Sequence, residues 1–331
     1  TSYAKNYAVN YSNGLSKNVS VQDGFTGQLG LNYGIKLGDK GFLNITGEYV
    51  SRGRTNRTGT YTGQVYPAVT GQTDDQIIAS KGLTRDAFDM RIGNSEVKGG
   101  GIVVNGALPI NDNLEAYVFG GYNNKKGNAA GFYRYPNGVP AAVRTGVFAL
   151  YPNGFLPEIT SDVTDLSIAA GVRGKIAKDW IFDLSNVYGK NIFDYGVQNS
   201  INYSQVGSVS TPQTSFDAGG NTFSQNTTNF DMSRKYGDIL EGLNVAFGAE
   251  YRVDQFGTRA GEEASYKNYN TSLGVAAGAQ VFPGFLPSNA GTHSRSNVGV
   301  YTDLELDVTK KWVVSGALRL ENYSDFGSTG L

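Results

Sequence analysis

Five short polar turns, each set between two runs of alternating apolar and polar residues, constrain the fold of this chain more than any other feature. The turns lie at residues 38–41, 111–113, 177–179, 234–242 and 309–311. They recur at intervals of roughly 60–75 residues, which leaves room for two long strands and one long loop between successive turns. Short turns at one end and long loops at the other are typical of the up-and-down β-barrels of bacterial outer membranes.

The residues beside each turn alternate between apolar and polar with a period of two. In residues 243–253, for example, Val245 and Phe247 share one face, and Glu250 and Arg252 share the other. Such alternation over about ten residues predicts strands, longer than the roughly five or six residues usual in a soluble β-sandwich. Two strands for each turn, and a first strand near residues 3–12, predict about eleven strands.

Composition narrows the class of protein. The 331 residues include no cysteine, which excludes a disulfide framework and a thiolate metal site. The formal net charge is −1, and because nucleic-acid binding needs a concentrated basic surface, we expect no nucleic-acid partner. No apolar run is long enough for a transmembrane helix, whereas a barrel strand needs only about 9–11 residues. The predicted fold class is all-β, a transmembrane antiparallel up-and-down β-barrel.

Long loops are predicted at 52–96, 125–162, 191–222 and 255–294, on the extracellular side, with the short turns facing the periplasm. Capping signals at Thr73 and Thr84 predict short helices in the first loop. Loops of this length are usually functional, and these contain many aromatic residues. The same aromatic residues are also expected if the loops simply pack on one another. The candidate ligand-binding residues are Tyr133, Arg134, Tyr135, Tyr151, Phe282, Phe285 and Arg295.

The sequence offers little for catalysis or metal binding. His293 is the one histidine, so a serine–histidine–aspartate triad would depend on it, and its polar neighbours predict an exposed loop residue instead. We therefore expect no catalytic residue, no metal site and no cofactor. The polar faces of the strands carry charges of both signs, which suits a hydrated pore or a wall that faces an internal plug domain, and not an ion-sieving field of one sign.

Several local segments carry a resemblance to a known family: GFYRYP at 131–136, ALYPNGFLP at 149–157, FGAEYR at 247–252, QVFPGF at 280–285 and ENYSDFGST at 321–329. Together they resemble the barrel of a TonB-dependent outer-membrane receptor. The resemblance implies that residues 1–331 are about half of a 22-stranded barrel whose lumen is plugged. The plug domain and the closing C-terminal strands have no counterpart in these residues.

The resemblance also implies partners: the TonB energy-coupling complex acting through the plug, outer-membrane lipid, and a nutrient ligand such as an iron chelate. The leading hypothesis is energised uptake of a scarce, bulky nutrient, which includes ferric siderophores, cobalamin, oligosaccharides and peptides. A passive outer-membrane porin, and a soluble carbohydrate-binding or adhesive β-protein, are the alternatives.

Overall fold

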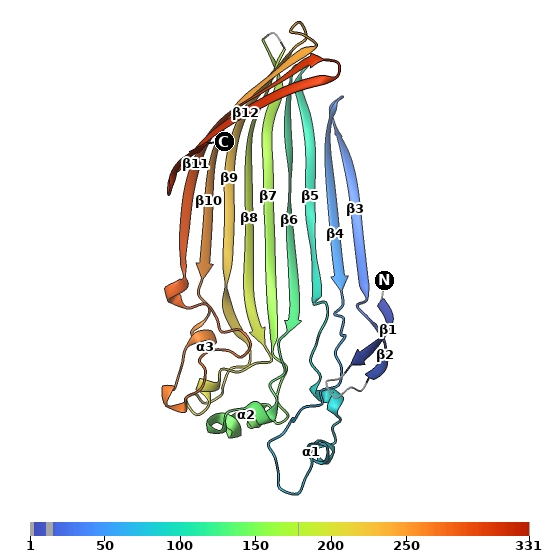
Figure 1. The fold of residues 1–331 in the computed structure, drawn as a ribbon, viewed down its shortest axis with the longest axis vertical. Coiled ribbons are helices and arrows are strands. Elements are labelled where there is room, and N and C mark those ends of the chain that lie inside the picture. Colours follow the sequence, from blue (N-terminus) through green and yellow to red (C-terminus); the bar gives the residue numbers. More distant parts are fainter. Residues whose placement is uncertain (1–2, 11–15, 178, 331) are drawn as a thin grey trace.

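The computed structural model describes residues 3–10, 16–177 and 179–330. Eleven antiparallel strands, β3 to β13, form one sheet in which neighbours in sequence are also neighbours in space. Figure 1 shows these strands side by side, with the helices and long connections gathered at one end. The up-and-down all-β prediction is confirmed. The strands are β3 (Thr26–Leu37), β4 (Gly41–Arg52), β5 (Glu96–Asn111), β6 (Leu114–Ala130), β7 (Glu158–Ile176), β8 (Trp180–Gln198), β9 (Phe216–Tyr236), β10 (Gly242–Arg259), β11 (Gly291–Thr309), β12 (Trp312–Tyr323) and β13 (Gly327–Gly330).

All five predicted turns connect successive strands of this sheet. The strands that they join are β3 to β4, β5 to β6, β7 to β8, β9 to β10 and β11 to β12. The central strands are long, and β9 alone has 21 residues. A strand needs only about 9–11 residues to cross a membrane, so the central strands extend beyond the hydrocarbon layer.

The predicted first strand, near residues 3–12, is wrong as a member of this sheet. Within that range, β1 (Tyr3–Asn10) pairs with β2 (Ser16–Asp23) in a separate two-stranded sheet, and residues 11 and 12 lie outside the described part of the chain. The eleventh strand of the large sheet is instead β13, which pairs with β12. Alternation alone finds a strand but does not choose its partner, and β1 forms a ladder with the segment that follows it in sequence.

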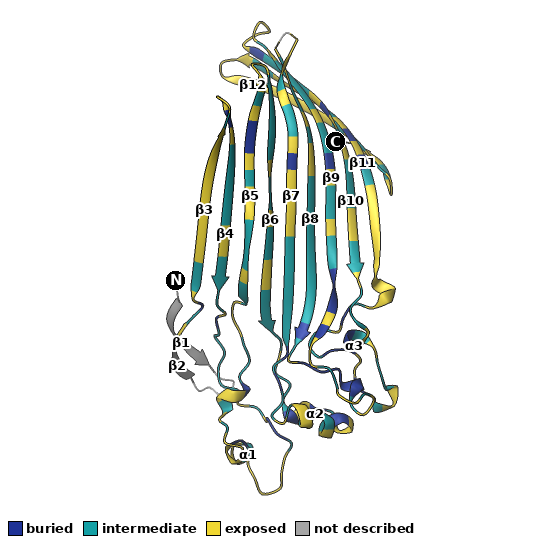
Figure 2. Cartoon of the chain, turned by 180° about the vertical axis from the view of Figure 1, so that it is seen from behind, coloured by how far each residue is buried: buried dark blue, intermediate teal, exposed yellow. Residues whose placement is uncertain are grey.

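The strand register divides the large sheet into two faces. The polar face carries Glu250, Asp303 and Arg319, and the apolar face carries Phe247 and Leu304, as the sequence predicts. Many large apolar residues of the sheet are exposed, including Leu31 on β3 and Leu318 on β12. Figure 2 shows long exposed stretches on β3 and β11. A row of exposed apolar side chains on one face is what contact with lipid requires.

The long loops are shorter than predicted, because the strands beside them are longer. The loops occupy residues 53–95, 131–157, 199–215 and 260–290. His293, expected in the last loop, and Arg295, expected at its end, therefore lie on strand β11. Within the described ranges, no helix is both long and apolar enough to cross a membrane. The helices and 3₁₀ turns lie in the loops: α1 (Asp74–Ser80), η1 (Arg85–Phe88), η2 (Pro136–Gly138), η3 (Ala141–Val143), α2 (Arg144–Leu150), η4 (Tyr203–Gln205), α3 (Glu263–Tyr266), η5 (Thr271–Leu273) and η6 (Pro287–Asn289).

Candidate functional site

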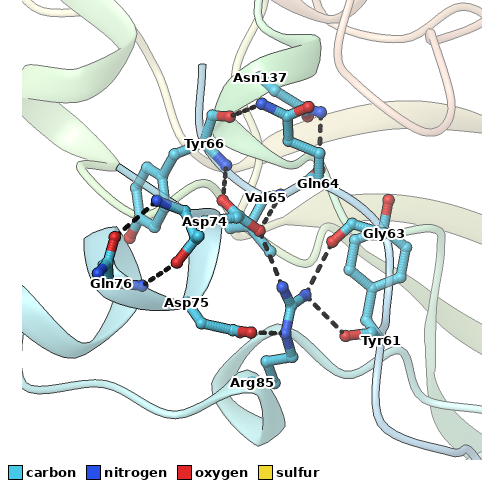
Figure 3. Close-up of polar contacts among 11 residues, drawn as sticks. Tyr61, Gly63, Gln64, Val65, Tyr66, Asp74, Asp75, Gln76, Arg85 and Asn137 are labelled. Carbon is cyan, nitrogen blue, oxygen red and sulfur yellow. Dashed lines mark hydrogen bonds and ion pairs between the residues drawn. The ribbon is translucent and has the colours of Figure 1, made fainter. Parts of the chain in front are cut away.

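A polar network organises the first long loop (Figure 3). Helix α1 begins with the predicted capping box, in which Gln76 N–H donates to the Thr73 hydroxyl and Thr73 N–H donates to the Gln76 side chain. The Asp74 carboxylate accepts the backbone N–H groups of residues 65 and 66 at 2.9 and 3.0 Å. Arg85 pairs with the carboxylates of Asp74 and Asp75 and donates to the carbonyl oxygens of residues 61 and 63. The carboxylates of Asp74 and Asp75 therefore stabilise the fold of the first loop through contacts with other residues of that loop.

Two of the predicted ligand-binding residues, Tyr133 and Tyr135, pack against a buried hydrophobic cluster that includes Tyr66 and Phe88. Their ring centres are 4.9 Å apart, and the Tyr135 ring stacks on Tyr61 at 3.9 Å. Phe88, which is fully buried, packs against Tyr133 at 5.8 Å. The Tyr133 hydroxyl donates to the carbonyl oxygen of residue 153 at 3.0 Å, and the Tyr135 hydroxyl donates to that of residue 88 at 3.3 Å. Both tyrosines hold the first two long loops together.

Burial also changes the acidity of these loop tyrosines. Burial, with a smaller effect from the nearby Tyr66, raises the pKa of Tyr133 to about 12. The pKa of Tyr135 is raised in the same way, by burial first and then by Tyr61, Asp89 and Tyr133. A phenol whose charged form is disfavoured remains a hydrogen-bond donor at neutral pH, which agrees with the two bonds that these hydroxyls donate.

Tyr151, Phe282 and Phe285 belong to two other clusters. Tyr151 packs against Phe155 at 4.6 Å, and its hydroxyl donates to the carbonyl oxygen of residue 200 at 3.1 Å. Phe282 and Phe285 lie 5.8 Å apart, and each contacts the Tyr195 ring, at 5.3 and 5.9 Å. The structure thus brings together the two phenylalanines, and separately the first two tyrosines, but not all the predicted residues.

Arg134 joins the second and fourth long loops. Its Nε donates to the Gln280 side chain at 3.2 Å, and a terminal nitrogen donates to the carbonyl oxygen of residue 132 at 2.9 Å. The backbone of Arg134 also bridges to Phe155. An arginine that is held at both ends of its guanidinium is less available to an incoming anion than the sequence suggests.

Arg295, the seventh predicted residue, stands apart from the loop clusters, on the polar face of the sheet. The register places it beside Asp254, which in turn faces Gln225 on β9. We call Gln225, Asp254 and Arg295 the polar row. Gln225 donates to one Asp254 oxygen at 2.8 Å, and Arg295 Nε donates to the other at 3.2 Å.

A second row of residues lies one step closer to the loops. Phe256 faces Phe223 on β9 and His293 on β11, and we call these three residues the ring row. Phe223 and Phe256 are 44% and 47% exposed, although they stand on the polar face. Successive positions on one face are about 7 Å apart along a strand, so the ring row and the polar row are neighbours.

Tyr323, from the ENYSDFGST segment, supports the polar row. The Arg295 guanidinium lies over the Tyr323 ring at 5.4 Å, and the Arg252 guanidinium lies over it at 6.0 Å. Arg252 also donates to the Tyr323 hydroxyl at 3.3 Å and lies 3.6 Å from the Asp254 carboxylate. This segment therefore has a local structural role: it places an aromatic ring under two arginines.

The two rows line a cavity of about 410 Å³ at the loop end of the polar face, together with Arg252, Ser294 and Asp325. Its volume lies within the usual range for small-ligand sites. A larger cavity of about 710 Å³ has Asp162, Asp194 and Arg259 in its wall. In the strand register these three charged residues share the apolar face, so that cavity does not open on the polar face.

Sequence reasoning missed five of the six members of the two rows as ligand-binding residues: Phe223, Gln225, Asp254, Phe256 and His293, the last of which it assigned to an exposed loop. The period-two pattern assigns Asp254 to a polar face, but it does not show which residues lie beside it on neighbouring strands. Those neighbours depend on the strand register, which the sequence does not determine when long loops separate the strands. Across the described residues, no group of three or more histidine, cysteine, aspartate and glutamate side chains is arranged to hold a metal ion.

Comparison with known proteins places this arrangement in a family. The structure is similar to that of the siderophore receptor PirA from Acinetobacter baumannii, with a TM-score of 0.51 and 16% sequence identity. The similarity covers 93% of this chain and 37% of that receptor, so the chain spans little more than a third of its relative, and the likeness concerns the fold. No curated protein matches the chain.

A family model described as TonB dependent receptor-like, beta-barrel, matches residues 105–331, which is more than half of the chain. The match begins on β5 and continues through the ENYSDFGST segment. This family match excludes the soluble β-protein alternative, because the barrels of this family lie in the bacterial outer membrane. The chain belongs to the TonB-dependent receptor family and forms part of its outer-membrane β-barrel.

Proposed function

We propose that the chain is the barrel part of a receptor for the energised uptake of a scarce, bulky nutrient. The observation that carries this proposal is the cavity on the polar face, where the ring row and the polar row meet at the loop end of the sheet. A nutrient that arrives from outside meets this end first. The loop residues Tyr133, Arg134, Tyr135, Tyr151, Phe282 and Phe285 shape the entrance by packing the loops, and Arg295 contacts the ligand. No residue acts as a catalyst.

The charges of the polar face favour a receptor over a passive porin. Arg252 lies between Glu250 and Asp254 on the same strand, at 3.6 Å from each. Arg319 lies 3.3 Å from Glu250 and 2.6 Å from Glu321. A row of unpaired cations would favour a pore that conducts anions, whereas alternating, paired charges suit a wall that contacts another polypeptide or a ligand. Energy would come from the TonB complex through a plug domain.

Uptake into cells tests this proposal against the porin alternative. Cells that express the full-length receptor would be given a panel of labelled nutrients: a ferric siderophore, cobalamin, an oligosaccharide and a peptide. The iron chelate is in the panel because the similar solved protein is a siderophore receptor. We expect accumulation of one nutrient to stop when the TonB complex is deleted. Accumulation that continues without that complex, together with swelling of vesicles that contain the receptor, would establish a passive pore.

A cysteine scan tests the orientation. The chain has no native cysteine, so a single introduced thiol reports one position. We expect a membrane-impermeant reagent on whole cells to label Asn137→Cys, in the second long loop, and to spare Asp112→Cys, in a short turn. The opposite pattern would place the loops in the periplasm and remove the proposed entrance.

A further inference from the structure

The cavity on the polar face also indicates the chemical class of its ligand. Its charged lining consists of two arginines, Arg252 and Arg295, and two aspartates, Asp254 and Asp325, so the formal charges sum to zero. Three of the four are already in contact: Arg295 and Arg252 approach the same Asp254 carboxylate at 3.2 and 3.6 Å. A strongly anionic ligand would have to compete with Asp254 for both arginines. The lining therefore does not favour net negative charge.

The cavity nevertheless offers donors and acceptors that are not used within the described part of the chain. The terminal nitrogens of Arg295 can donate, since the guanidinium bonds Asp254 through Nε. The Gln225 carbonyl oxygen can accept, since Gln225 bonds Asp254 through its amide nitrogen. The side chains of His293 and Asp325 line the same cavity and make no hydrogen bond or ion pair to the side chains of the described residues. A ligand that fits must both donate and accept over a short distance, as a hydroxyl group does.

The ring row supplies two exposed phenylalanine rings and an imidazole beside these groups. Phe223, Phe256 and His293 lie across three adjacent strands, which places them along a line of about 10 Å. An exposed aromatic ring next to a row of polar groups contacts a ligand that has one apolar face and one polar edge. The C–H face of a sugar ring and its hydroxyl groups have this arrangement.

We propose that this cavity binds a neutral saccharide, with sugar rings on Phe223 and Phe256 and hydroxyl groups on the polar row. This inference rests on the proposed receptor function and specifies its ligand class. Arg295 donates hydrogen bonds to ring or hydroxyl oxygens, and the Gln225 carbonyl and the Asp325 carboxylate accept hydrogen bonds from hydroxyl groups. The paired charges of Asp254 and the two arginines hold the polar row in place without selecting a charged ligand.

Binding to the purified full-length receptor tests the ligand class. The probes are neutral oligomers of glucose, galactose, mannose, xylose and N-acetylglucosamine, a ferric catecholate chelate, ferric citrate and a neutral hexapeptide. We expect one neutral saccharide to bind, with a dissociation constant that changes less than about two-fold between low and high salt, because no net charge is bound. A charged chelate would bind more weakly as salt is added.

Matched variants locate the site. Phe256→Ala is expected to weaken saccharide binding by about ten-fold or more, as is Arg295→Gln, since central aromatic and arginine contacts dominate binding. Phe119→Ala is the control: Phe119 stands on the polar face of β6, is 52% exposed and lies outside the cavity, so its loss is expected to leave affinity unchanged. Folding is checked by the heat-dependent gel mobility of each barrel.

The outcomes separate the two proposals. If a ferric chelate or the peptide binds and depends on Phe256, the receptor function stands and the saccharide inference is wrong. If no probe in the saccharide panel binds, or if Phe256→Ala and Phe119→Ala behave alike, the inference is also overturned. If a saccharide binds but enters cells without the TonB complex, the inference stands and the proposed energised uptake fails.

Discussion

In the long loops, the tyrosines of the predicted site pack against one another, whereas on the polar face of the sheet two phenylalanines leave nearly half of their surface exposed. Tyr133 and Tyr135 lie in a cluster whose centre, Phe88, is fully buried. Phe223 and Phe256 lie beside charged and amide groups and line a cavity. This difference indicates that the aromatic residues of these long loops mainly stabilise the folded loops. A ring that remains exposed beside polar groups is the better candidate for ligand binding.

The largest expected effect is on the stability of the first long loop, and it tests whether the loop aromatics form a buried cluster. Phe88→Ala should lower the free energy of opening of the first loop by about 3–5 kcal/mol, because it removes a buried ring and leaves a cavity. Hydrogen exchange at the backbone amides of Val65 and Tyr66, which Asp74 protects, measures that free energy. Phe132→Ala is the control, with a change within about 0.5 kcal/mol, because Phe132 is 71% exposed. Similar exchange in both variants would contradict the loop cluster.

The ten strands joined by the five short turns, and their order, could be predicted from sequence, whereas the pairing of β1 with β2, the strand β13 and the ends of the strands could not. The alternating pattern is clear where one face contacts lipid, as at Val245 and Phe247. Nearer the loops polar residues stand on both faces, at Asn124 and Asn191, and the alternation breaks down although the backbone ladder continues. There Asn124 donates to Asp162 and Asn191 donates to Asp165 across neighbouring strands, so side-chain hydrogen bonds replace apolar packing.

The candidate site was predictable in its residue types but not in its location. Tyr133, Phe282 and the other loop aromatics were chosen because aromatic residues bind ligands well, yet the same residues also make good loop cores. Arg295 was chosen as a loop residue and proves to be a strand residue. Its neighbours Asp254 and Gln225 come from segments about 41 and 70 residues earlier, so only the register brings them together.

A second prediction concerns the two faces of the sheet. Phe247→Arg should destabilise the folded barrel by about 2–4 kcal/mol if the residue lies near the middle of the membrane, because a charge on the lipid side is costly there. Ala246→Arg, one residue away on the polar face, should cost less. Denaturant titration of the full-length protein in lipid vesicles gives both values. Equal costs at the two positions would mean that the faces are assigned wrongly.

A third, smaller effect concerns a close approach on the polar face. The Tyr301 hydroxyl on β11 donates to Asp231 on β9 at 2.6 Å, crossing over Gly248 on the strand between them. A methyl group at Gly248 would lie 2.5 Å from the Tyr301 ring and 2.7 Å from the carbonyl oxygen of residue 230. Gly248→Ala should therefore cost about 1–3 kcal/mol, the usual cost of overpacking.

Gly189→Ala is the matched control for Gly248→Ala. Gly189 lies on the polar face of β8, and a methyl group there would lie within 4 Å of no atom beyond its own and the two adjacent residues. Its replacement should change stability by less than about 1 kcal/mol, with either sign. The same denaturant titration compares the two variants. If Gly189→Ala costs as much as Gly248→Ala, the loss reflects the backbone and not the Tyr301 crossing.

The smallest expected effect returns to the loop tyrosines. Tyr133→Phe removes the bond from the hydroxyl to the carbonyl oxygen of residue 153, and should lower the free energy of loop opening at neutral pH by about 0.5–1.5 kcal/mol.

Burial raises the pKa of Tyr133 to about 12, above the value of roughly 10 in an unfolded chain. The contribution of this phenol is therefore complete below pH 10 and is lost as the pH rises toward 12. Hydrogen exchange and tyrosinate absorbance, measured from pH 9 to 12, should show a steeper loss of loop protection in the native protein than in Tyr133→Phe. Equal slopes, with all tyrosines ionised near pH 10, would mean that Tyr133 is exposed and free to bind a ligand, and the contrast with the ring row would disappear.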